Sequence, residues 1–216
     1  LLYIIIGVNL LVGCGRKAAP QYVIGVSQCS EDIWRDKFNK ELQMAEYLND
    51  SIQVKLASSN DDSKLQTRQI NQMIDEKVDL LVIAPNQLNT ISPAINRAYD
   101  KGIPVIIYDR KANSNKYTAF IGCDNYAIGK SMGEFIAQKL QGKGRVVEIR
   151  GLESSSPALE RHRGFMEAMK KYPGMQVVAS EAGDWKEESG KKAMQRILDK
   201  TRDFDYVFSH NDRMGW

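Results

Sequence analysis

The chain has 216 residues, 43% of them apolar and 26% charged, a composition typical of a globular protein with one large or two small domains. Its net charge of +3 is spread along the sequence without a basic patch, which argues against a nucleic-acid partner. No C-x-x-C spacing or His/Cys cluster predicts a metal site, and no cofactor is expected. A disulfide between Cys29 and Cys123 is conceivable, but the usual burial of single cysteines favours two free thiols.

The first residues differ from the rest of the chain. Leu1–Val12 is apolar apart from Asn9, has the length of a signal-peptide core and is shorter than the roughly 20 residues that span a bilayer. The end of this segment resembles a bacterial lipobox, which would make Cys14 a lipidation site. An ordinary secretory signal or a clipped membrane anchor are the alternatives. Each places the domain outside the cytoplasm, with residues 1–14 as the leader segment and residues 15–21 as a linker.

From Tyr22 onward, predicted strands and helices alternate. The clearest unit has two short apolar runs, Leu80–Ala84 and Val105–Tyr108, which are typical of strands buried on both faces. Between them, Thr90–Lys101 has apolar residues at helical spacing, with Ile91, Ala94, Ile95 and Ala98 on one face. A helix over residues 32–48 is likewise expected to bury Phe38, Leu42, Ala45 and Leu48.

The remaining predicted strands are Tyr22–Val26, Ile52–Ala57, Tyr117–Gly122, Arg145–Ile149, Met175–Ser180 and Tyr206–Ser209. The remaining predicted helices cover residues 64–76, 124–140, 157–171 and 185–200. Such alternation predicts an α/β protein with parallel sheets and right-handed crossovers. The polar segment Lys111–Lys116 contains no helix, which breaks the pattern of an eight-stranded barrel. We therefore predict two sheets, with an N-terminal lobe over residues 22–123 and a C-terminal lobe over residues 124–216.

Several motifs occur in an order that resembles the type I periplasmic sugar-binding proteins of the ribose/galactose kind. They are Val26-Ser27 followed by Trp34, Asn86 after Ala84-Pro85, Ile103–Arg110, Gly122–Asn125, Glu160-Arg161 before Gly164-Phe165, and Asn211-Asp212. The resemblance covers Tyr22 to Trp216. It implies two Rossmann-like lobes, joined by a hinge of three crossings, with a monosaccharide held in the cleft between them.

The resemblance also implies ligand-binding residues. Trp34 matches an aromatic residue that stacks on the sugar, and Ile33 stands where the family has a second aromatic. Asp109 and Arg110 match a pair that binds hydroxyls. In the second lobe, the matching positions are Arg161, Trp185 and Asn211. Glu31 replaces an asparagine of the ribose-binding members, which changes the expected ligand.

The same resemblance implies a hinge crossing at Asp124 and Asn125. It also implies that two further strands and the remaining crossings follow Trp216, so that the C-terminal lobe is incomplete and the chain is a fragment. We expect Asp109→Ala to abolish sugar binding and to leave the fold intact.

Four functions are compatible with these features. The first is the sensing region of a two-component receptor, in which a longer chain would carry a histidine kinase, and the second is a sugar-binding lipoprotein of an ABC transporter. A transcription regulator of the lac-repressor type shares the implied fold, but an export-like segment stands where its DNA-binding motif would be. An enzyme is disfavoured because no nucleophile lies at a suggestive spacing from His162 or His210.

Overall fold

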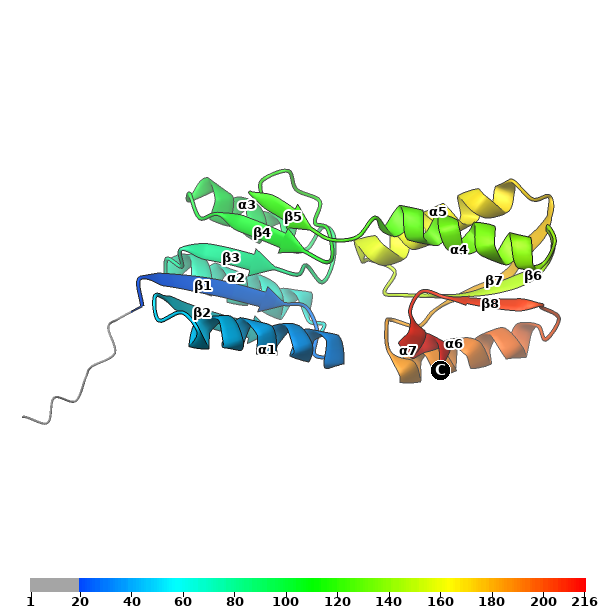
Figure 1. Ribbon diagram of the computed structural model, residues 1–216, viewed down its shortest axis with the longest axis horizontal. Coiled ribbons are helices and arrows are strands. Elements are labelled where there is room, and N and C mark those ends of the chain that lie inside the picture. Colours follow the sequence, from blue (N-terminus) through cyan, green and yellow to red (C-terminus); the bar gives the residue numbers. More distant parts are fainter. Residues whose placement is uncertain (1–19) are drawn as a thin grey trace, which may run out of the picture.

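The computed structural model describes residues 20–216, which form two lobes, each built on a parallel β-sheet (Figure 1). The first sheet has five strands in the order β2-β1-β3-β4-β5, and the second has three described strands in the order β7-β6-β8. Every strand pair in both sheets is parallel. The predicted α/β class with two Rossmann-like lobes is confirmed.

All eight predicted strands and six predicted helices are present within a few residues of their expected bounds. The strands are β1 (Tyr22–Gln28), β2 (Ile52–Ser58), β3 (Leu80–Ile83), β4 (Val105–Tyr108), β5 (Ala119–Ile121), β6 (Lys143–Arg150), β7 (Gly174–Ala182) and β8 (Tyr206–Ser209). The helices are α1 (Ile33–Tyr47), α2 (Ser63–Asp75), α3 (Ser92–Asp100), α4 (Asn125–Lys139), α5 (Ser156–Lys170), α6 (Glu187–Lys200) and the additional α7 (Asp212–Gly215). The expected lipidation site Cys14 lies outside the described residues, and no helix within residues 20–216 is long and apolar enough to cross a membrane.

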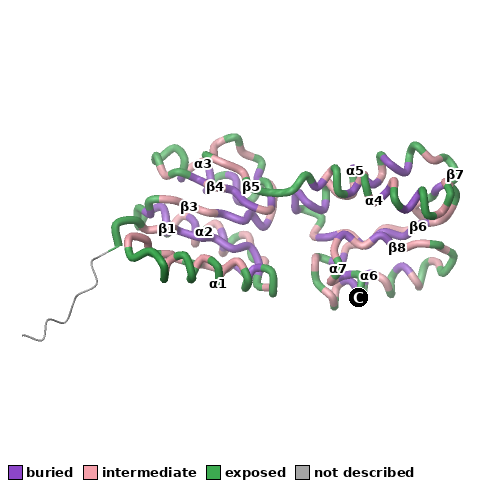
Figure 2. The backbone as a smooth tube through the Cα atoms, in the orientation of Figure 1, coloured by how far each residue is buried: buried purple, intermediate pink, exposed green. Residues whose placement is uncertain are grey.

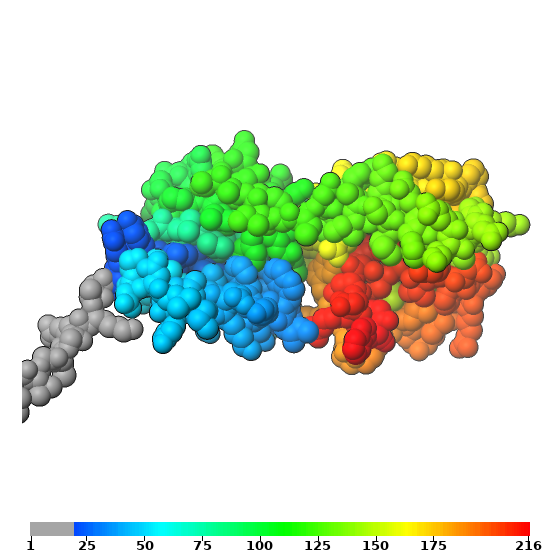
Figure 3. Space-filling model, in the orientation of Figure 1, coloured from blue at the N-terminus to red at the C-terminus, as the bar shows by residue number. Residues whose placement is uncertain are grey.

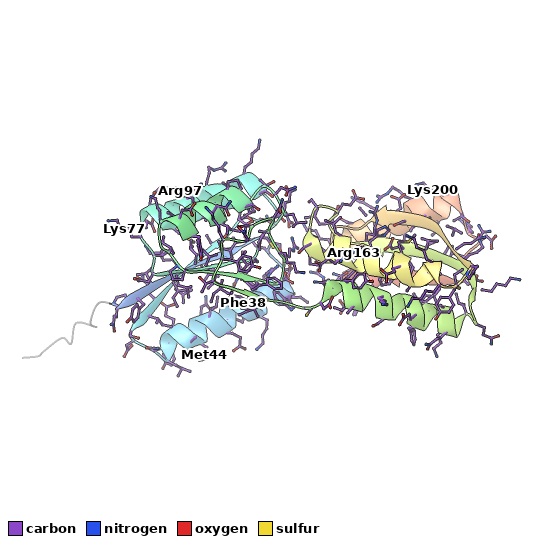
Figure 4. All side chains as sticks on the ribbon, turned by 90° about the horizontal axis from the view of Figure 1, so that it is seen from above. Phe38, Met44, Lys77, Arg97, Arg163 and Lys200 are labelled. Atoms are coloured by element: carbon purple, nitrogen blue, oxygen red, sulfur yellow. The ribbon has the colours of Figure 1, made fainter. Side chains whose placement is uncertain are left out.

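Helices cover both faces of each sheet, as right-handed crossovers require. In the first lobe, the strands lie between α1, which carries Met44, and α3, which carries Arg97 (Figure 4). The predicted inward face of α3 is confirmed, because Ile91, Ala94, Ile95 and Ala98 are all buried. In the second lobe, Phe165 of α5 packs on Phe208 of β8 with their ring centroids 4.5 Å apart.

The prediction for the buried face of α1 is wrong in its C-terminal half. Phe38 and Leu42 are half-buried, but Ala45 is exposed and Leu48 is 74% exposed. Figure 2 shows α1 exposed along most of its length. Within the described residues α1 has no helix beside it on its face of the sheet, so only the side nearest the strands is covered. Helical periodicity predicts which face of a helix is apolar, but it does not show how much of that face is covered by other elements.

Helices α4 and α5 approach each other very closely. A Cβ atom added at Gly129 would lie 1.9 Å from the carbonyl oxygen of Arg161, and one added at Gly164 would lie 2.1 Å from the carbonyl oxygen of Tyr126. Only glycine allows backbones to approach this far. The contact fixes the position of the first turns of α5, where Arg161 lies.

The lobes are joined by residues 122–124, between the end of β5 at Ile121 and the start of α4 at Asn125. The space-filling view shows the first lobe meeting the C-terminal segment along a narrow boundary (Figure 3). The amide N–H of Leu88 donates to the carbonyl oxygen of Ser154 across it at 3.2 Å. Cys29 is buried, Cys123 is exposed, and neither forms a disulfide.

We predict that Gly129→Ala lowers the free energy of unfolding by about 1–3 kcal/mol, because overpacking at this contact forces the two helices apart. Denaturant titration measures the loss. Gly215→Ala is the matched control, since its added methyl group would meet its nearest neighbour at 3.5 Å, an ordinary contact distance. Equal stability of the two variants would contradict the role assigned to the helix contact.

Candidate functional site

The two lobes enclose a cleft of about 490 Å³ between the carboxyl ends of their strands. Open α/β sheets bind ligands at this edge, and the volume lies within the range of small-molecule sites. The cleft is lined by Asp32, Ile33, Trp34, Arg35, Lys37, Asp109, Arg110, Pro157, Arg161, Trp185, Asn211, Asp212 and Arg213. Both lobes therefore contribute polar and aromatic side chains to one cavity.

The start of α1 presents an aromatic ring to the cleft. Asp32 caps the helix, and its carboxylate accepts from the backbone N–H groups of Trp34 at 2.9 Å and Arg35 at 3.0 Å. Such a cap fixes the first turn of the helix. Trp34 is 55% exposed and lines the cleft, so part of its ring is free to contact a ligand there.

Arg35 is a site residue that the sequence analysis missed. Its side chain is only 3% exposed, and Nη2 donates to Oδ2 of Asp109 at 2.5 Å. The guanidinium carbon lies 4.7 Å from the ring centroid of Trp34 and 5.4 Å from that of Tyr108. Nη1 is buried without a hydrogen-bond partner among the described residues. The only sequence signal was its position one residue after Trp34 in the first turn of the helix.

The carboxylate of Asp109 lies between two guanidinium groups. Besides Arg35, Nε of Arg110 lies 3.9 Å from Oδ2 of Asp109. Arg110 is itself buried and donates from Nη1 to Oδ1 of Asn86 at 3.2 Å. Asp109 has a φ of 61°, a left-handed conformation that costs energy for residues other than glycine and is common at ligand sites.

The second lobe holds Arg161 from three sides. Nε donates to Oδ1 of Asn125 at 2.9 Å, and Nη1 donates to the carbonyl oxygen of His210. The guanidinium carbon also lies 5.5 Å from the ring centroid of Trp185. Burial lowers the pKa of Arg161, although the negative charge of Asp109 partly opposes this. The electrostatic influence of Asp109 on Arg161 acts across the cleft, from one lobe to the other.

Asn211 lines the second-lobe side of the cleft and forms hydrogen bonds to α7 and to Trp185. Its Oδ1 accepts from the backbone N–H of Met214 at 3.0 Å and caps α7. Its Nδ2 donates to the carbonyl oxygen of Trp185 at 3.3 Å. Trp185 has a φ of 69°, so this bond stabilises a strained loop that carries an indole ring into the cleft wall.

The cleft brings together seven of the eight predicted ligand-binding residues, namely Ile33, Trp34, Asp109, Arg110, Arg161, Trp185 and Asn211. Glu31 is the exception: it is exposed and lines a neighbouring hollow with Asp36 and Arg213. The reason is its place before the cap of α1, where the chain has not yet turned into the helix. Among the described residues, no group of three His, Cys, Asp or Glu side chains could hold a metal ion.

The predicted hinge residues lie at the junction of the lobes. Asp124 accepts from the backbone N–H of Ala127 at 2.9 Å and caps α4, whereas Asn125 is buried and holds Arg161. Their part in a hinge motion stays a prediction. Through Asn125, the junction between the lobes also orients Arg161 in the cleft.

Comparison with known proteins identifies the family. A model of the periplasmic binding protein domain matches residues 24–216. The chain belongs to this family. Members of the periplasmic binding protein family are binding modules rather than enzymes, and membership implies a location outside the cytoplasm.

Two curated proteins and one solved structure show how similar the chain is to individual members of the family. The galactofuranose-binding protein of Escherichia coli is 28% identical over 99% of this chain and 69% of its own length. The ribose import binding protein of Bacillus subtilis is 32% identical over 76% of this chain and 53% of its own length. Among solved structures, the fructose-binding periplasmic domain of a hybrid two-component system is 42% identical with a TM-score of 0.86, covering 89% of this chain and 64% of its own. The chain thus spans about half to two thirds of these relatives.

We predict that Asp109→Asn lowers the free energy of unfolding by about 1–3 kcal/mol, because it leaves the buried guanidinium of Arg35 without its closest counter-charge; the figure is reduced for the partial exposure of Asp109. This revises the expectation that Asp109 can be replaced with the fold unaffected. Asp75→Asn is the control, because Asp75 and Arg97 form an ion pair on the surface. Thermal and denaturant unfolding compare the two variants, and a loss no larger than that of the control would refute the prediction.

Proposed function

We propose that this member of the periplasmic binding protein family binds a monosaccharide in the cleft between its lobes. The observation that carries the proposal is the carboxylate of Asp109 between two guanidinium groups, next to the exposed ring of Trp34 and opposite Arg161. A sugar presents an apolar C–H face and a rim of hydroxyl groups. Indole rings cover such a face and leave the rim free for hydrogen bonds.

The polar residues complement the hydroxyl rim. An ionised carboxylate only accepts hydrogen bonds, whereas guanidinium groups only donate them in a fixed planar geometry. One hydroxyl group can therefore donate to Asp109 and accept from a neighbouring arginine. Hydrogen bonds to charged groups contribute about 1.5–3 kcal/mol each in net terms. The buried, unpaired Nη1 of Arg35 is one donor that a small rearrangement would make available to a ligand.

We further propose that the sugar is bound in a furanose form, with fructose as the first candidate. The relative with 42% identity is named for fructose. Two other solved relatives, 27% and 28% identical, are an arabinose-transporter component bound to arabinofuranose and a galactofuranose-binding protein. A five-membered ring also presents a smaller face, which suits a first-lobe wall where Ile33 replaces one expected aromatic.

In its cellular role, the domain is proposed to be the sensing region of a two-component receptor. The hybrid two-component relative supports this role, and the ABC transporter relatives support the alternative of a transport receptor. Attachment to the membrane through a lipid on Cys14 or through an N-terminal anchor belongs to the same proposal.

A thermal-shift screen of the complete protein tests the ligand. We expect fructose to raise the melting temperature, because a ligand at about 100 times its Kd adds about 2.7 kcal/mol of stability. Ribose, arabinose and galactose vary the hydroxyl pattern, and myo-inositol serves as a polyol that is not a sugar. Because free sugars interconvert between five- and six-membered rings in water, methyl fructofuranoside and methyl fructopyranoside, whose rings are fixed, test the ring form. Stabilisation by none of the sugars would refute the proposed function, and stabilisation by the fructopyranoside but not by the fructofuranoside would refute the furanose form.

A second test uses two aromatic residues of the same helix. We expect Trp34→Ala to weaken sugar binding by about tenfold or more, equivalent to about 1.4 kcal/mol, because it removes the ring that covers the sugar face. Tyr47→Ala is the matched control, since Tyr47 is 81% exposed near the far end of α1 and does not line the cleft. Titration calorimetry measures both, and equal affinities would remove Trp34 from the site.

A further inference from the structure

The second lobe contains a buried polar cluster behind the cleft wall. The side chain of Glu148, on β6, is 0% exposed and contacts three polar side chains. Oε2 lies 2.8 Å from Nδ1 of His162 and accepts from the hydroxyl of Ser180 at 2.6 Å, while Oε1 lies 3.0 Å from Nε2 of His210. A buried carboxylate is costly unless such donors surround it. None of these four residues lines the cleft.

The hydrogen bonds of His210 define its protonation. The backbone N–H of Gly151 points to Nδ1 of His210 at 3.2 Å, so Nδ1 must be the acceptor. Nε2 then carries the proton and donates to Glu148. A neutral imidazole satisfies both neighbours, whereas a second proton would lie on Nδ1 and face the N–H of Gly151. The side chain of His210 is 0% exposed, so water does not replace the lost bond readily.

His210 also reaches three parts of the cleft wall. Its carbonyl oxygen accepts from Nη1 of Arg161, and the next residue in the chain is Asn211. Its ring holds the backbone of Gly151, which lies against Trp185: a Cβ atom added at Gly151 would be 2.1 Å from the indole ring. One residue therefore connects the buried cluster to the guanidinium, the amide and the indole of the second-lobe wall.

We propose that His210 is a positioning residue for ligand binding: its side chain and its carbonyl oxygen together hold the second-lobe wall in place, and they do so only while the imidazole is neutral. The proposal rests on the proposed function, since it concerns the sugar-binding activity of the same cleft. It makes ligand affinity decrease on acidification. His210 itself does not contact the ligand.

The charged and titratable groups that face His210 are Glu148 on β6 and Arg161 and His162 on α5. Burial lowers the pKa of His210 and outweighs Glu148, which raises it, while Arg161 and His162 lower it further. Burial raises the pKa of Glu148, but hydrogen bonds from His162, His210 and Ser180 outweigh this and lower it to about 2. Glu148 thus stays ionised in mild acid. The contribution of neutral His210 is complete above its usual pKa of about 6.5 and is lost as the pH falls through the lowered value.

The test compares His210→Gln with His210→Leu in the complete protein, with fructose as the titrant. The Gln side chain can accept from Gly151 and donate to Glu148 but does not titrate, whereas Leu leaves the N–H of Gly151 unpaired and removes one of the three partners of Glu148. We expect the Gln variant to keep wild-type affinity and to lack the decrease in affinity that the wild type shows below about pH 6.5. We expect the Leu variant to bind at least about tenfold more weakly throughout. His162→Gln is the control, because His162 contacts Glu148 without lining the cleft. It should retain affinity near neutral pH and still lose affinity on acidification, with the midpoint of the loss moved to higher pH because His162 no longer lowers the pKa of His210.

Three results would overturn the inference: wild-type affinity in the Leu variant, an unchanged pH profile in the Gln variant, or the same losses in the His162 control. Nitrogen-15 NMR of the imidazole tests the tautomer without any sugar. A neutral ring protonated on Nε2 is expected near pH 7, and a proton on Nδ1 of His210 would refute the inference independently. Failure of the wild type to bind any sugar, with the expected tautomer, would instead refute the proposed function. Circular dichroism establishes that each variant is folded.

Discussion

The buried guanidinium of Arg35 requires a counter-charge, and Asp109 provides the closest one. Removal of a charge from water costs several kcal/mol, so this pair constrains everything attached to its two ends. It ties the first turn of α1 to the end of β4, two places 74 residues apart in the sequence. It also offsets the strain of the positive φ at Asp109. Trp34 is held in place as a consequence, because it precedes Arg35 on a capped helix turn.

The two halves of the cleft are fixed by different means. The first lobe uses an ion pair between side chains, whereas the second lobe holds Arg161 with neutral groups, the side chain of Asn125 and a carbonyl oxygen. Arg161 therefore has no carboxylate within ion-pair distance among the described residues. The charge with the largest favourable influence on Arg161 is Asp109 across the cleft. In the first lobe Arg35 and Arg110 share the single carboxylate of Asp109, and in the second lobe Arg161 pairs with none within residues 20–216. The attraction of Asp109 for Arg161 across the cleft is therefore part of the site.

The sequence was sufficient to predict the strands, the helices and the edge at which the cleft lies, because apolar runs and turn residues are local features. It was also sufficient to bring Asp109, Arg161 and Trp34 together through a family resemblance. It did not reveal Arg35, since arginine is almost never buried and nothing local distinguishes a buried one. The exposure of Leu48, and the position of Glu31 in a hollow beside the cleft, were not evident for a related reason. Both depend on which neighbours are present in space, and periodicity along one helix carries no such information.

The contacts between the lobes bear on how a ligand would close the cleft. They include the N–H of Lys111 bonded to the hydroxyl of Ser156 at 2.7 Å and the ion pair of Lys186 with Asp61 at 2.5 Å. A net hydrogen bond contributes about 1 kcal/mol and a partly exposed ion pair between about 0 and 1 kcal/mol. A shift from a mostly open to a mostly closed population requires about 5.5 kcal/mol of differential affinity. Each of these contacts contributes only a small part of that difference, so in a closure of this kind charged hydrogen bonds to a ligand in both lobes would contribute the larger part.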